Sequence, residues 1–433
     1  MNPNDDHSLL ARFDAVLSPD ERGVVALARG WAARQRAPLY AVGGSVRDLL
    51  LGRAHLDLDL AVGGDAGALA HCIAAELGGR ATTYAHFGTA TVSAPGWSVD
   101  IARTRTERYV YAGALPVVDP APIEADLARR DFSIHAMAIA LTGADAGRLI
   151  DPYGGRADLE ARSLRVLHGE SFRDDPTRIM RLARYAARLS FAVEPGTEAL
   201  ARRDTPFIPA VNPARITHEL ERTFAEVRPE RVLRRLERWH ALRALFAGFA
   251  LPAALEEGCE RLRSDGGPAA ASAEYLALIA AHWDRAAIQA LPGALELGHD
   301  TLIALRDLPS ARATLVALVA APIDPVTACD QLAALNLAAV RGAAAAAGDP
   351  AAALVRRFIA DWRALRPALR GNDLLALGVP VGPAVGWLLD RLRRGKLQGE
   401  LRTAADEAAI VHDWLEARQN EPIGGRWKRG CDE

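Results

Sequence analysis

The alternation of apolar and polar residues is most informative between residues 37 and 64, in the stretch APLYAVGGSVRDLLLGRAHLDLDLAVGG. The apolar run at 39–42 predicts a buried strand. Gly43 and Gly44 interrupt this run, and the residues after them predict a short amphipathic helix from Ser45 to Leu51. The pattern therefore predicts a strand, a glycine turn and a helix, in that order.

A second strand is predicted at residues 56–60, where leucine and aspartate alternate strictly. Successive side chains of a strand point to opposite faces, so Asp57 and Asp59 should share one face while the leucines occupy the other. Two carboxylates on one face repel each other unless a cation lies between them, and hard oxygen ligands at this spacing suit Mg²⁺. We therefore expect Asp57 and Asp59 to be metal ligands.

The glycine turn has the features of a phosphate-binding site. Glycines at 43 and 44 let backbone N–H groups approach a ligand, and the N-terminus of the helix that follows favours negative charge. Arg47 adds a cation that can donate two hydrogen bonds to phosphate oxygens. A lone glycine turn is usually only a turn, and a lone Asp-x-Asp is usually a solvated strand face. Their combination indicates a triphosphate site that faces a metal pair.

The flanking residues predict ordinary elements. The first 17 residues are expected to form a loose arm, and a capping box at Ser18-Pro19-Asp20-Glu21 predicts a helix that ends near residue 35. Another helix is predicted at 66–77, between Asp65 as its cap and a glycine pair. The segments 87–92 and 97–101 predict a hairpin that extends the sheet.

Two features of the next segment bear on chemistry. Asp100 ends the predicted hairpin, and a third carboxylate on the same sheet face could complete the metal site or orient an attacking hydroxyl. Residues 103–119 mix charged, aromatic, glycine and proline residues without periodicity, which predicts a mobile loop that closes near the substrate.

From about residue 160 the pattern predicts helices to the end of the chain. In the segment FRDDPTRIMRLARY, Asp174 is the expected cap, and Asp175 and Arg178 are expected three residues apart on one helix face. A basic ridge should continue along this helix through Arg181, Arg184 and Arg188. Such a ridge by itself is usually an ion-paired, solvated surface. A second basic helix, at 228–243, could equally follow an RNA backbone or be an exposed face.

Composition limits the class of protein. The 433 residues, half of them hydrophobic, are enough for about three or four domains, and a net charge of −2 excludes a uniformly basic surface but allows local basic patches. Four scattered cysteines indicate neither a disulfide framework nor a zinc site. The polar N-terminus is unlike a signal peptide, and no apolar run approaches the length that spans a membrane. We expect a soluble cytoplasmic protein with no membrane partner.

The order GG followed by DLD resembles the nucleotidyltransferase superfamily, and GGSVRDLLLG resembles the head of the class II CCA-adding tRNA nucleotidyltransferase and bacterial poly(A) polymerase family. The segment RRDFSIHAM is similar to the family motif RRDFTINAM, DPYGGRADL is similar to its next motif, and the arginine-rich helix is similar to EDxxRxxRxxR. This resemblance is strong over about residues 37–225. It implies an α+β protein: a nucleotidyltransferase head with a small mixed β-sheet, followed by an all-α neck, body and tail.

The resemblance also implies domain boundaries and residue roles. The head would span 1–160, a neck that selects the nucleobase 161–255, a body 256–350, and a tail that binds tRNA 351–433. The triphosphate and nucleotide would be bound by residues of the head and neck: Gly43, Gly44, Arg47, Arg130, Asp131, Asp175, Arg178, Arg181 and Arg184. The catalytic carboxylates would be those of Asp57, Asp59 and Asp100.

Three positions depart from the family pattern. His135 stands where the motif has Asn, and Asp174 stands where Glu is usual. Residues 112–115 lack the Asp and Arg that the family often carries in its loop. The contacts of His135 and the role of the loop are therefore open.

The resemblance implies attack of an RNA 3′-hydroxyl on the α-phosphate of CTP or ATP, with Mg²⁺ as cofactor and tRNA as acceptor. Cytosine and adenine both present an amino donor beside a ring-nitrogen acceptor, which Asp175 and Arg178 could recognise without a template. Alternatives are a poly(A) polymerase, an enzyme that adds only CC or only A, and a catalytically idle RNA-binding protein. Whether the chain is a monomer or a dimer is open.

Overall fold

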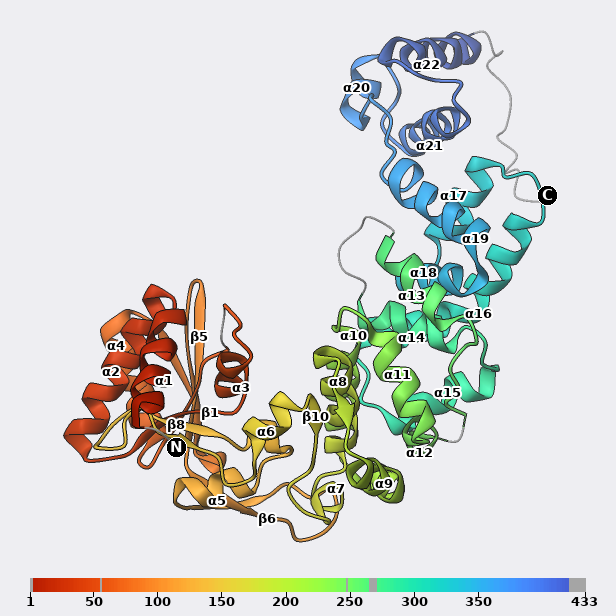
Figure 1. The fold of residues 1–433 in the computed structure, drawn as a ribbon. Coiled ribbons are helices and arrows are strands. Elements are labelled where there is room, and N and C mark those ends of the chain that lie inside the picture. Colours follow the sequence, from red (N-terminus) through yellow and green to blue (C-terminus); the bar gives the residue numbers. More distant parts are fainter. Residues whose placement is uncertain (1–2, 55–56, 247, 265–270, 420–433) are drawn as a thin grey trace. The chain divides into compact units, whose positions relative to one another are not determined.

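The computed structural model describes residues 3–54, 57–246, 248–264 and 271–419. The chain divides into two compact units, Met1–Ala250 with Leu291–Glu296, and Leu251–Ala290 with Leu297–Glu433. The expected head and most of the expected neck lie together in the first unit, and the finer division into four domains stays a prediction. The mixed sheet lies in the first unit and the second is helical, which confirms the predicted α+β fold (Figure 1).

A seven-stranded sheet forms the centre of the first unit, in the order β3-β4-β5-β2-β1-β8-β9. Strands β2 and β5 run parallel, with Asp59 in register with Asp100, and the other neighbouring strands in this sheet are antiparallel. The strands are β1 (Leu39–Val42), β2 (Asp59–Val62), β3 (Arg80–Tyr84), β4 (Thr89–Ala94), β5 (Trp97–Arg103), β8 (Ala138–Ala140) and β9 (Leu149–Ile150).

Helices cover the two faces of this sheet unequally. On one face, α4 (Ala66–Leu77) packs on β3, β4 and β5, and α2 (Pro19–Gln35) packs on β1 and β5. On the opposite face, α5 (Ile123–Ala128) forms an apolar cluster with β1, β2 and β8. The apolar cluster leaves β3, β4 and the outer part of β5 outside it.

Local sequence signals place these elements. Ser18 and Glu21 form the predicted capping box at the start of α2, with each side chain hydrogen-bonded to the backbone N–H of the other residue. Asp65 caps α4 by accepting from the N–H of Ala68, and Gly78 ends it in the left-handed conformation. The β4–β5 hairpin also forms as predicted. These three predictions are confirmed.

The expectation of a loose N-terminal arm is wrong. Helix α1 (Pro3–Val16) occupies this segment, and Leu9, Phe13 and Leu17 are buried in the core. Their spacing of four residues places them on one helix face, so the arm has an apolar stripe that packs on the head.

The expectation of a loop at 103–119 is wrong for the two ends of this segment, which form strands, whereas residues 109–116 connect them as a loop. Strand β5 continues to Arg103, and β6 (Arg105–Arg108) pairs with β7 (Val117–Pro120) as an antiparallel hairpin. Contacts between charged side chains hold this hairpin, and such contacts leave no pattern of hydrophobic residues in the sequence.

The segment that contains RRDFSIHAM is not a continuous helix, and the carboxylate strand begins later than expected. The segment beginning at Asp126 is helical only to Ala128, after which a 3₁₀ turn at Ser133–His135 leads into β8. The strand expected at 56–60 begins at Asp59; Leu56 lies outside the described residues.

The rest of the first unit is mainly helical, as predicted, with one small two-stranded sheet. Helix α8 packs against α10 and α11. The elements are α3 (Gly44–Leu50), α6 (Gly155–Glu160), α7 (Ser171–Asp174), α8 (Thr177–Leu189), α9 (Pro195–Asp204), a 3₁₀ turn (Thr205–Ala210), α10 (Pro213–Phe224), α11 (Pro229–Arg238) and α12 (Ala241–Leu245), with β10 (Ser163–Leu164) and β11 (Ala192–Val193).

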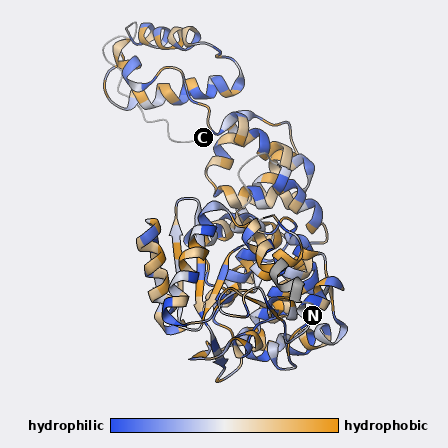
Figure 2. Cartoon of the chain, turned by 60° about the vertical axis from the view of Figure 1, so that its left-hand side comes forward, coloured by the Kyte–Doolittle hydropathy of each residue, from blue (hydrophilic) through white to orange (hydrophobic). Residues whose placement is uncertain are grey.

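The second unit contains amphipathic helices, along which hydrophobic and hydrophilic segments alternate (Figure 2). A separate apolar cluster, centred on Leu388 and Leu392, holds its last three helices together. No helix among the described residues has the length and hydropathy needed to cross a membrane. The helices are α13 (Leu255–Ser264), α14 (Ser272–Ala280), α15 (Arg285–Ala294), α16 (His299–Val319), α17 (Pro325–Ala333), α18 (Leu337–Ala347), α19 (Asp349–Arg357), a π-helical turn (Phe358–Trp362), α20 (Gly371–Ala376), α21 (Pro383–Gln398) and α22 (Ala404–Gln419).

The burial of Phe13 predicts that α1 belongs to the folded head. Phe13→Ala should lower the free energy of unfolding by about 3–5 kcal/mol, because it removes a fully buried ring and leaves a cavity. Urea unfolding followed by tryptophan fluorescence measures this change. Ala15→Ser, at an exposed position of the same helix, should change it by less than about 0.5 kcal/mol. If the Phe13 variant is as stable as the parent, α1 does not pack on the head and this segment is a loose arm.

Candidate active site

A polar pocket of about 360 Å³ opens in the first unit. It gathers ten of the twelve residues predicted to bind nucleotide or metal; Asp100 and Arg184 do not line it. The lining residues are Gly43, Gly44, Arg47, Asp57, Asp59, Glu107, Tyr109, Arg129, Arg130, Asp131, His135, Asp175, Arg178, Arg181, Tyr185 and Arg188.

Three carboxylates lie close together on one face of the sheet. Asp59 opens β2, Asp57 precedes it by two residues, and Asp100 is its partner in register on β5. Thr91 donates a hydrogen bond of 2.6 Å to Asp100 and so fixes the orientation of that carboxylate. Burial, followed by the negative charge of Asp57, raises the pKa of Asp59 to about 7, although Arg130 opposes the shift.

This donor set fits a magnesium ion. Among the described residues no group of three His, Cys, Asp or Glu side chains is arranged to hold a metal, so an ion bound here would have Asp57 and Asp59 as its ligands from the protein and would need others from the substrate or water. Mg²⁺ is commonly bound by one or two carboxylates together with substrate phosphates and water. The uncompensated charge that raises the pKa of Asp59 is also the charge that a divalent cation would relieve.

The glycine turn needs a glycine at position 43 in particular. Gly43 has a φ of 64°, in the left-handed region, and a Cβ there would lie 2.5 Å from Nη1 of Arg130. A Cβ on Gly44 would lie 3.5 Å from Oδ2 of Asp59. A larger residue at position 43 would therefore strain the backbone and displace the Arg130 guanidinium, whereas a Cβ at position 44 would make an ordinary van der Waals contact with Asp59.

Ser45 joins the glycine turn to the carboxylate strand, a role that the sequence analysis missed. Its hydroxyl donates to the carbonyl oxygen of Asp57 at 2.6 Å and accepts from the N–H of Asp59 at 2.7 Å. The only signal in the sequence was a serine directly after the glycine pair, which is common at helix starts.

A chain of hydrogen bonds runs along the pocket from Arg47, beside the glycine turn, to Arg181 on α8. Arg47 contacts Nε2 of His135 at 2.7 Å, Nδ1 of His135 contacts Asp131 at 2.8 Å, and Arg181 donates to the other oxygen of Asp131 at 2.9 Å. Burial lowers the pKa of His135, although Asp131 opposes this, so the imidazole is neutral near pH 7. Its Nδ1–H then donates to Asp131 and its Nε2 accepts from Arg47.

This arrangement explains how His135 can occupy a position where the family motif has Asn. A neutral imidazole presents one donor and one acceptor, as a side-chain amide does. The substitution therefore preserves the hydrogen-bonding pattern with Asp131 and Arg47.

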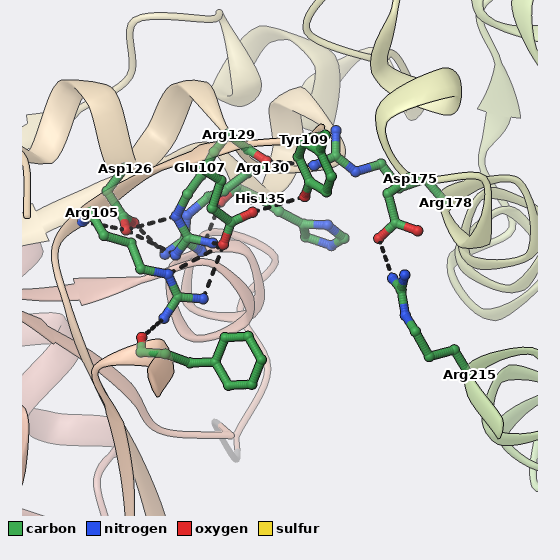
Figure 3. A network of polar contacts seen from close by, with 11 residues as sticks. Arg105, Glu107, Tyr109, Asp126, Arg129, Arg130, His135, Asp175, Arg178 and Arg215 are labelled. Carbon is green, nitrogen blue, oxygen red and sulfur yellow. Dashed lines mark hydrogen bonds and ion pairs between the residues drawn. The ribbon is translucent and has the colours of Figure 1, made fainter. Parts of the chain in front are cut away.

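Glu107 is the centre of a buried network that the sequence analysis also missed (Figure 3). One of its oxygens accepts from Arg105 at 3.0 Å and from Arg129 at 2.7 Å, and the other accepts from the hydroxyl of Tyr109 at 2.9 Å. Asp126, itself buried, accepts from Arg129 and Arg130. The network fixes the β6–β7 hairpin at the pocket wall, next to α5.

The predicted base-selecting pair reaches the pocket in a different arrangement. Asp174 ends α7 and does not cap α8, which Pro176 directly precedes; Asp175 lies between the two helices in an extended conformation and accepts from the N–H and hydroxyl of Thr177. Its second oxygen accepts from Arg215 at 2.8 Å (Figure 3). Asp175 and Arg178 therefore both face the pocket but do not share a helix. Pro176 explains the error, because it disfavours a helical conformation for the residue before it.

Two arginines of the basic ridge expected on α8, Arg178 and Arg184, are buried, whereas Arg181 is half-buried and Arg188 is exposed. Arg178 donates to Ser171 and to the carbonyl oxygen of Arg129, and Arg184, only 2% exposed, pairs with Glu219. The ring of Tyr185 packs among the guanidinium groups of Arg47, Arg181, Arg184 and Arg188, at 5.0–5.9 Å.

The basic segment at 228–243 has a buried side too. Trp239 is 2% exposed and donates to Glu198 at 3.0 Å, so its ring is part of the core and does not face RNA.

Comparison with known proteins identifies the family. Residues 39–165 match the family described as poly A polymerase head domain, and residues 190–251 match the probable RNA- and SrmB-binding site of polymerase A. The A-adding tRNA nucleotidyltransferase of Halalkalibacterium halodurans is 32% identical over 394 residues, which cover 90% of this chain and 91% of that protein. The chain belongs to the tRNA nucleotidyltransferase family.

Two further similarities extend over most of this nucleotidyltransferase. The CC-adding tRNA nucleotidyltransferase of Deinococcus radiodurans is 33% identical over 380 residues, covering 88% of this chain and 90% of that protein. The solved structure of a Thermotoga maritima CCA-adding enzyme complexed with tRNA superposes with a TM-score of 0.74 and 26% identity, covering 95% of this chain and 98% of that one. The enzyme class and fold expected from the sequence are thereby confirmed.

The raised pKa of Asp59 predicts how the metal-free nucleotidyltransferase responds to pH. The folded state holds the Asp59 proton up to about pH 7, whereas the unfolded chain releases it near 3.8, so this group's stabilising contribution is lost as the pH rises between these values. Asp59→Asn should therefore stabilise the protein at pH 8 in EDTA by roughly 2 kcal/mol, and by much less at pH 4.

Thermal unfolding at the two pH values, with EDTA or with Mg²⁺, measures this difference. Mg²⁺ should raise the melting temperature of the parent but not of Asp59→Asn, because the ion binds the folded parent. If the stability of parent and variant depends on pH in the same way, the pKa of Asp59 is not raised in the folded protein.

Proposed function

We propose that this nucleotidyltransferase adds C and A to the 3′ end of tRNA without a template, using CTP and ATP and releasing pyrophosphate. The observation that carries the proposal is a single pocket in which the glycine turn, the carboxylates and the pair Asp175 and Arg178 all meet. The relatives' names, A-adding and CC-adding, and the Thermotoga maritima complex with tRNA support tRNA as the acceptor.

The base-selecting chemistry depends on one acceptor and one donor. Asp175 can accept from the amino group of cytosine or adenine, and Arg178 can donate to the adjacent ring nitrogen. Uracil and guanine present a carbonyl and an N–H at these positions, which would leave the carboxylate facing an oxygen and the guanidinium facing an N–H. A site with fixed side chains can therefore accept cytosine and adenine and reject uracil and guanine.

The remaining residues would bind and orient the nucleotide. The N–H groups of the glycine turn and Arg47 would bind the triphosphate, and Asp131, held by Arg181, would accept from ribose hydroxyls. Asp57 and Asp59 would hold Mg²⁺, as a pair of ions. When bound, Mg²⁺ lowers the pKa of the attacking hydroxyl and neutralises charge on the departing pyrophosphate.

In the tail, two tryptophans offer a surface for RNA. Trp387 is 51% exposed, its ring lies 6.4 Å from that of Trp414, and guanidinium groups of Arg391 and Arg418 lie over the two rings. Aromatic rings beside cations suit unpaired nucleobases and the RNA backbone. We assign tRNA binding to this surface. We place the enzyme in the cytoplasm, where it would act as a monomer or a dimer.

Two alternatives stay within the same chemistry. The relatives named A-adding and CC-adding favour a partial enzyme that adds only one of the two bases. A poly(A) polymerase would use the same pocket with an unstructured RNA. A catalytically idle RNA-binding protein is disfavoured, because an idle site has no reason to retain three neighbouring carboxylates.

The choice among these functions is tested with three tRNA transcripts, which lack CCA, end in CC or end in complete CCA, with CTP or ATP supplied separately. The full activity predicts CTP addition to the first, ATP addition to the second and none to the third. Asp57→Ala should lower every rate by roughly a thousandfold while tRNA binding is retained, because the loss falls on the transition state. Extension of an unstructured oligonucleotide as efficient as that of tRNA would favour poly(A) synthesis.

The selecting role of Asp175 predicts a loss of discrimination. Asp175→Ala should reduce the preference for CTP over UTP by about ten- to a hundredfold, since a well-placed hydrogen-bonding pair is worth about 1–3 kcal/mol. Competition assays measure this ratio. The control is Asp174→Ala, a neighbouring carboxylate that does not line the pocket and should leave the ratio unchanged. If Asp175→Ala rejects UTP as well as the parent does, base selection lies elsewhere.

A further inference from the structure

A second cavity, of about 370 Å³, lies on the carboxylate face of the sheet, over β2, β4 and β5. Asp59 and Arg130 line both this cavity and the nucleotide pocket, so the two meet at the carboxylate expected to bind metal. The strand order separates them: the glycine turn follows β1 on one side of β2, whereas β5, β4 and β3 lie on the other. Val42, at the end of β1, also lines the cavity, but most of its lining lies on β5, β4 and β3, on the side of Asp59 opposite the glycine turn.

The register of the strands defines the floor of this cavity. Tyr84, Thr89 and Ala102 form one row across β3, β4 and β5, and Thr91 and Asp100 belong to the next row on the same face. The side chain of Tyr84 is 52% exposed and lines the cavity. An exposed aromatic ring thus stands at the end of a floor of small side chains.

The geometry of in-line phosphoryl transfer indicates which substrate would occupy this cavity. The attacking and leaving oxygens lie on opposite sides of the reacting phosphorus. If the triphosphate extends from Asp59 toward the glycine turn and Arg47, pyrophosphate leaves on that side. The attacking hydroxyl must then approach from the side of β5, where the second cavity lies.

We propose that the second cavity binds the 3′-terminal nucleoside of the RNA acceptor, with its base stacked on Tyr84 and its 3′-hydroxyl beside Asp100. This inference rests on the proposed nucleotide addition and names the acceptor site for it. Thr91 positions Asp100 through its hydrogen bond of 2.6 Å, which leaves the second carboxylate oxygen available to the hydroxyl. Arg130, at the junction of the two cavities, supplies a cation for the phosphate backbone.

The dimensions agree with a single nucleoside. Tyr84 lies two strands and two residues from Asp100, a separation of about 12 Å between backbone positions. A tyrosine side chain together with one nucleoside covers this distance. Stacking on an aromatic ring tolerates any base, as an acceptor site must when its terminal nucleotide changes after each addition.

Steady-state kinetics with a tRNA acceptor-stem minihelix test the stacking role. Tyr84→Ala should raise the KM for the minihelix about tenfold and leave the KM for CTP and ATP unchanged, whereas Tyr84→Phe, which keeps the ring, should match the parent. Thr83→Ala is the control, because Thr83 is the exposed neighbour of Tyr84 on β3, points to the opposite face of the sheet and lines neither cavity. An unchanged KM for the minihelix in Tyr84→Ala overturns the proposal.

A cross-linking experiment gives a result that does not depend on turnover. A minihelix carrying 4-thiouridine as its last nucleotide is irradiated with the parent enzyme, and the cross-linked peptide is mapped. Cross-links within residues 82–91 support the acceptor site, and cross-links only to nucleotide-pocket residues overturn it. If the parent does not extend the minihelix, the proposed function fails, and the cross-linked position alone decides where the RNA terminus binds.

Discussion

The repulsion between neighbouring carboxylates at the start of β2 is the constraint on which the rest of the head depends. Asp59 is partly buried, lies beside Asp57 and is in register with Asp100, and its loss of solvent and these neighbouring charges raise its pKa to about 7. The surrounding fold must hold these groups together against their own charge. An apolar core beneath the sheet supplies that support, since Leu58 and Leu60, on the opposite face, are both buried.

The remaining walls of the pocket are held by charged hydrogen bonds, with little apolar packing of their own. Asp131 is fixed by Arg181, and Glu107 by Arg105, Arg129 and the Tyr109 hydroxyl. Such groups stabilise a site only when every partner is present, because a buried charge without its partner is strongly destabilising. The pocket is therefore positioned by several elements at once, which keeps donors and acceptors fixed before the nucleotide arrives.

Short-range signals in the sequence were sufficient for the centre of the site but not for its walls. The alternation at Asp57 and Asp59, the glycine turn and the capping box each depend on a few adjacent residues, so the sequence predicted them. The β6–β7 hairpin depends on Glu107 meeting Arg129 across 22 residues, and the orientation of Asp175 depends on Arg215, 40 residues later. Pairings at such distances leave no periodicity along the chain.

The support of Asp175 has an evolutionary consequence. Both of its oxygens already accept hydrogen bonds, from Thr177 and Arg215, so the direction in which it meets a base is set by its neighbours. Arg215 also donates to the carbonyl oxygen of Gly113, in the turn of the β6–β7 hairpin. If Asp175 selects the base as proposed, two descendants with identical selecting residues could therefore diverge in the nucleotide they add through changes in that turn alone.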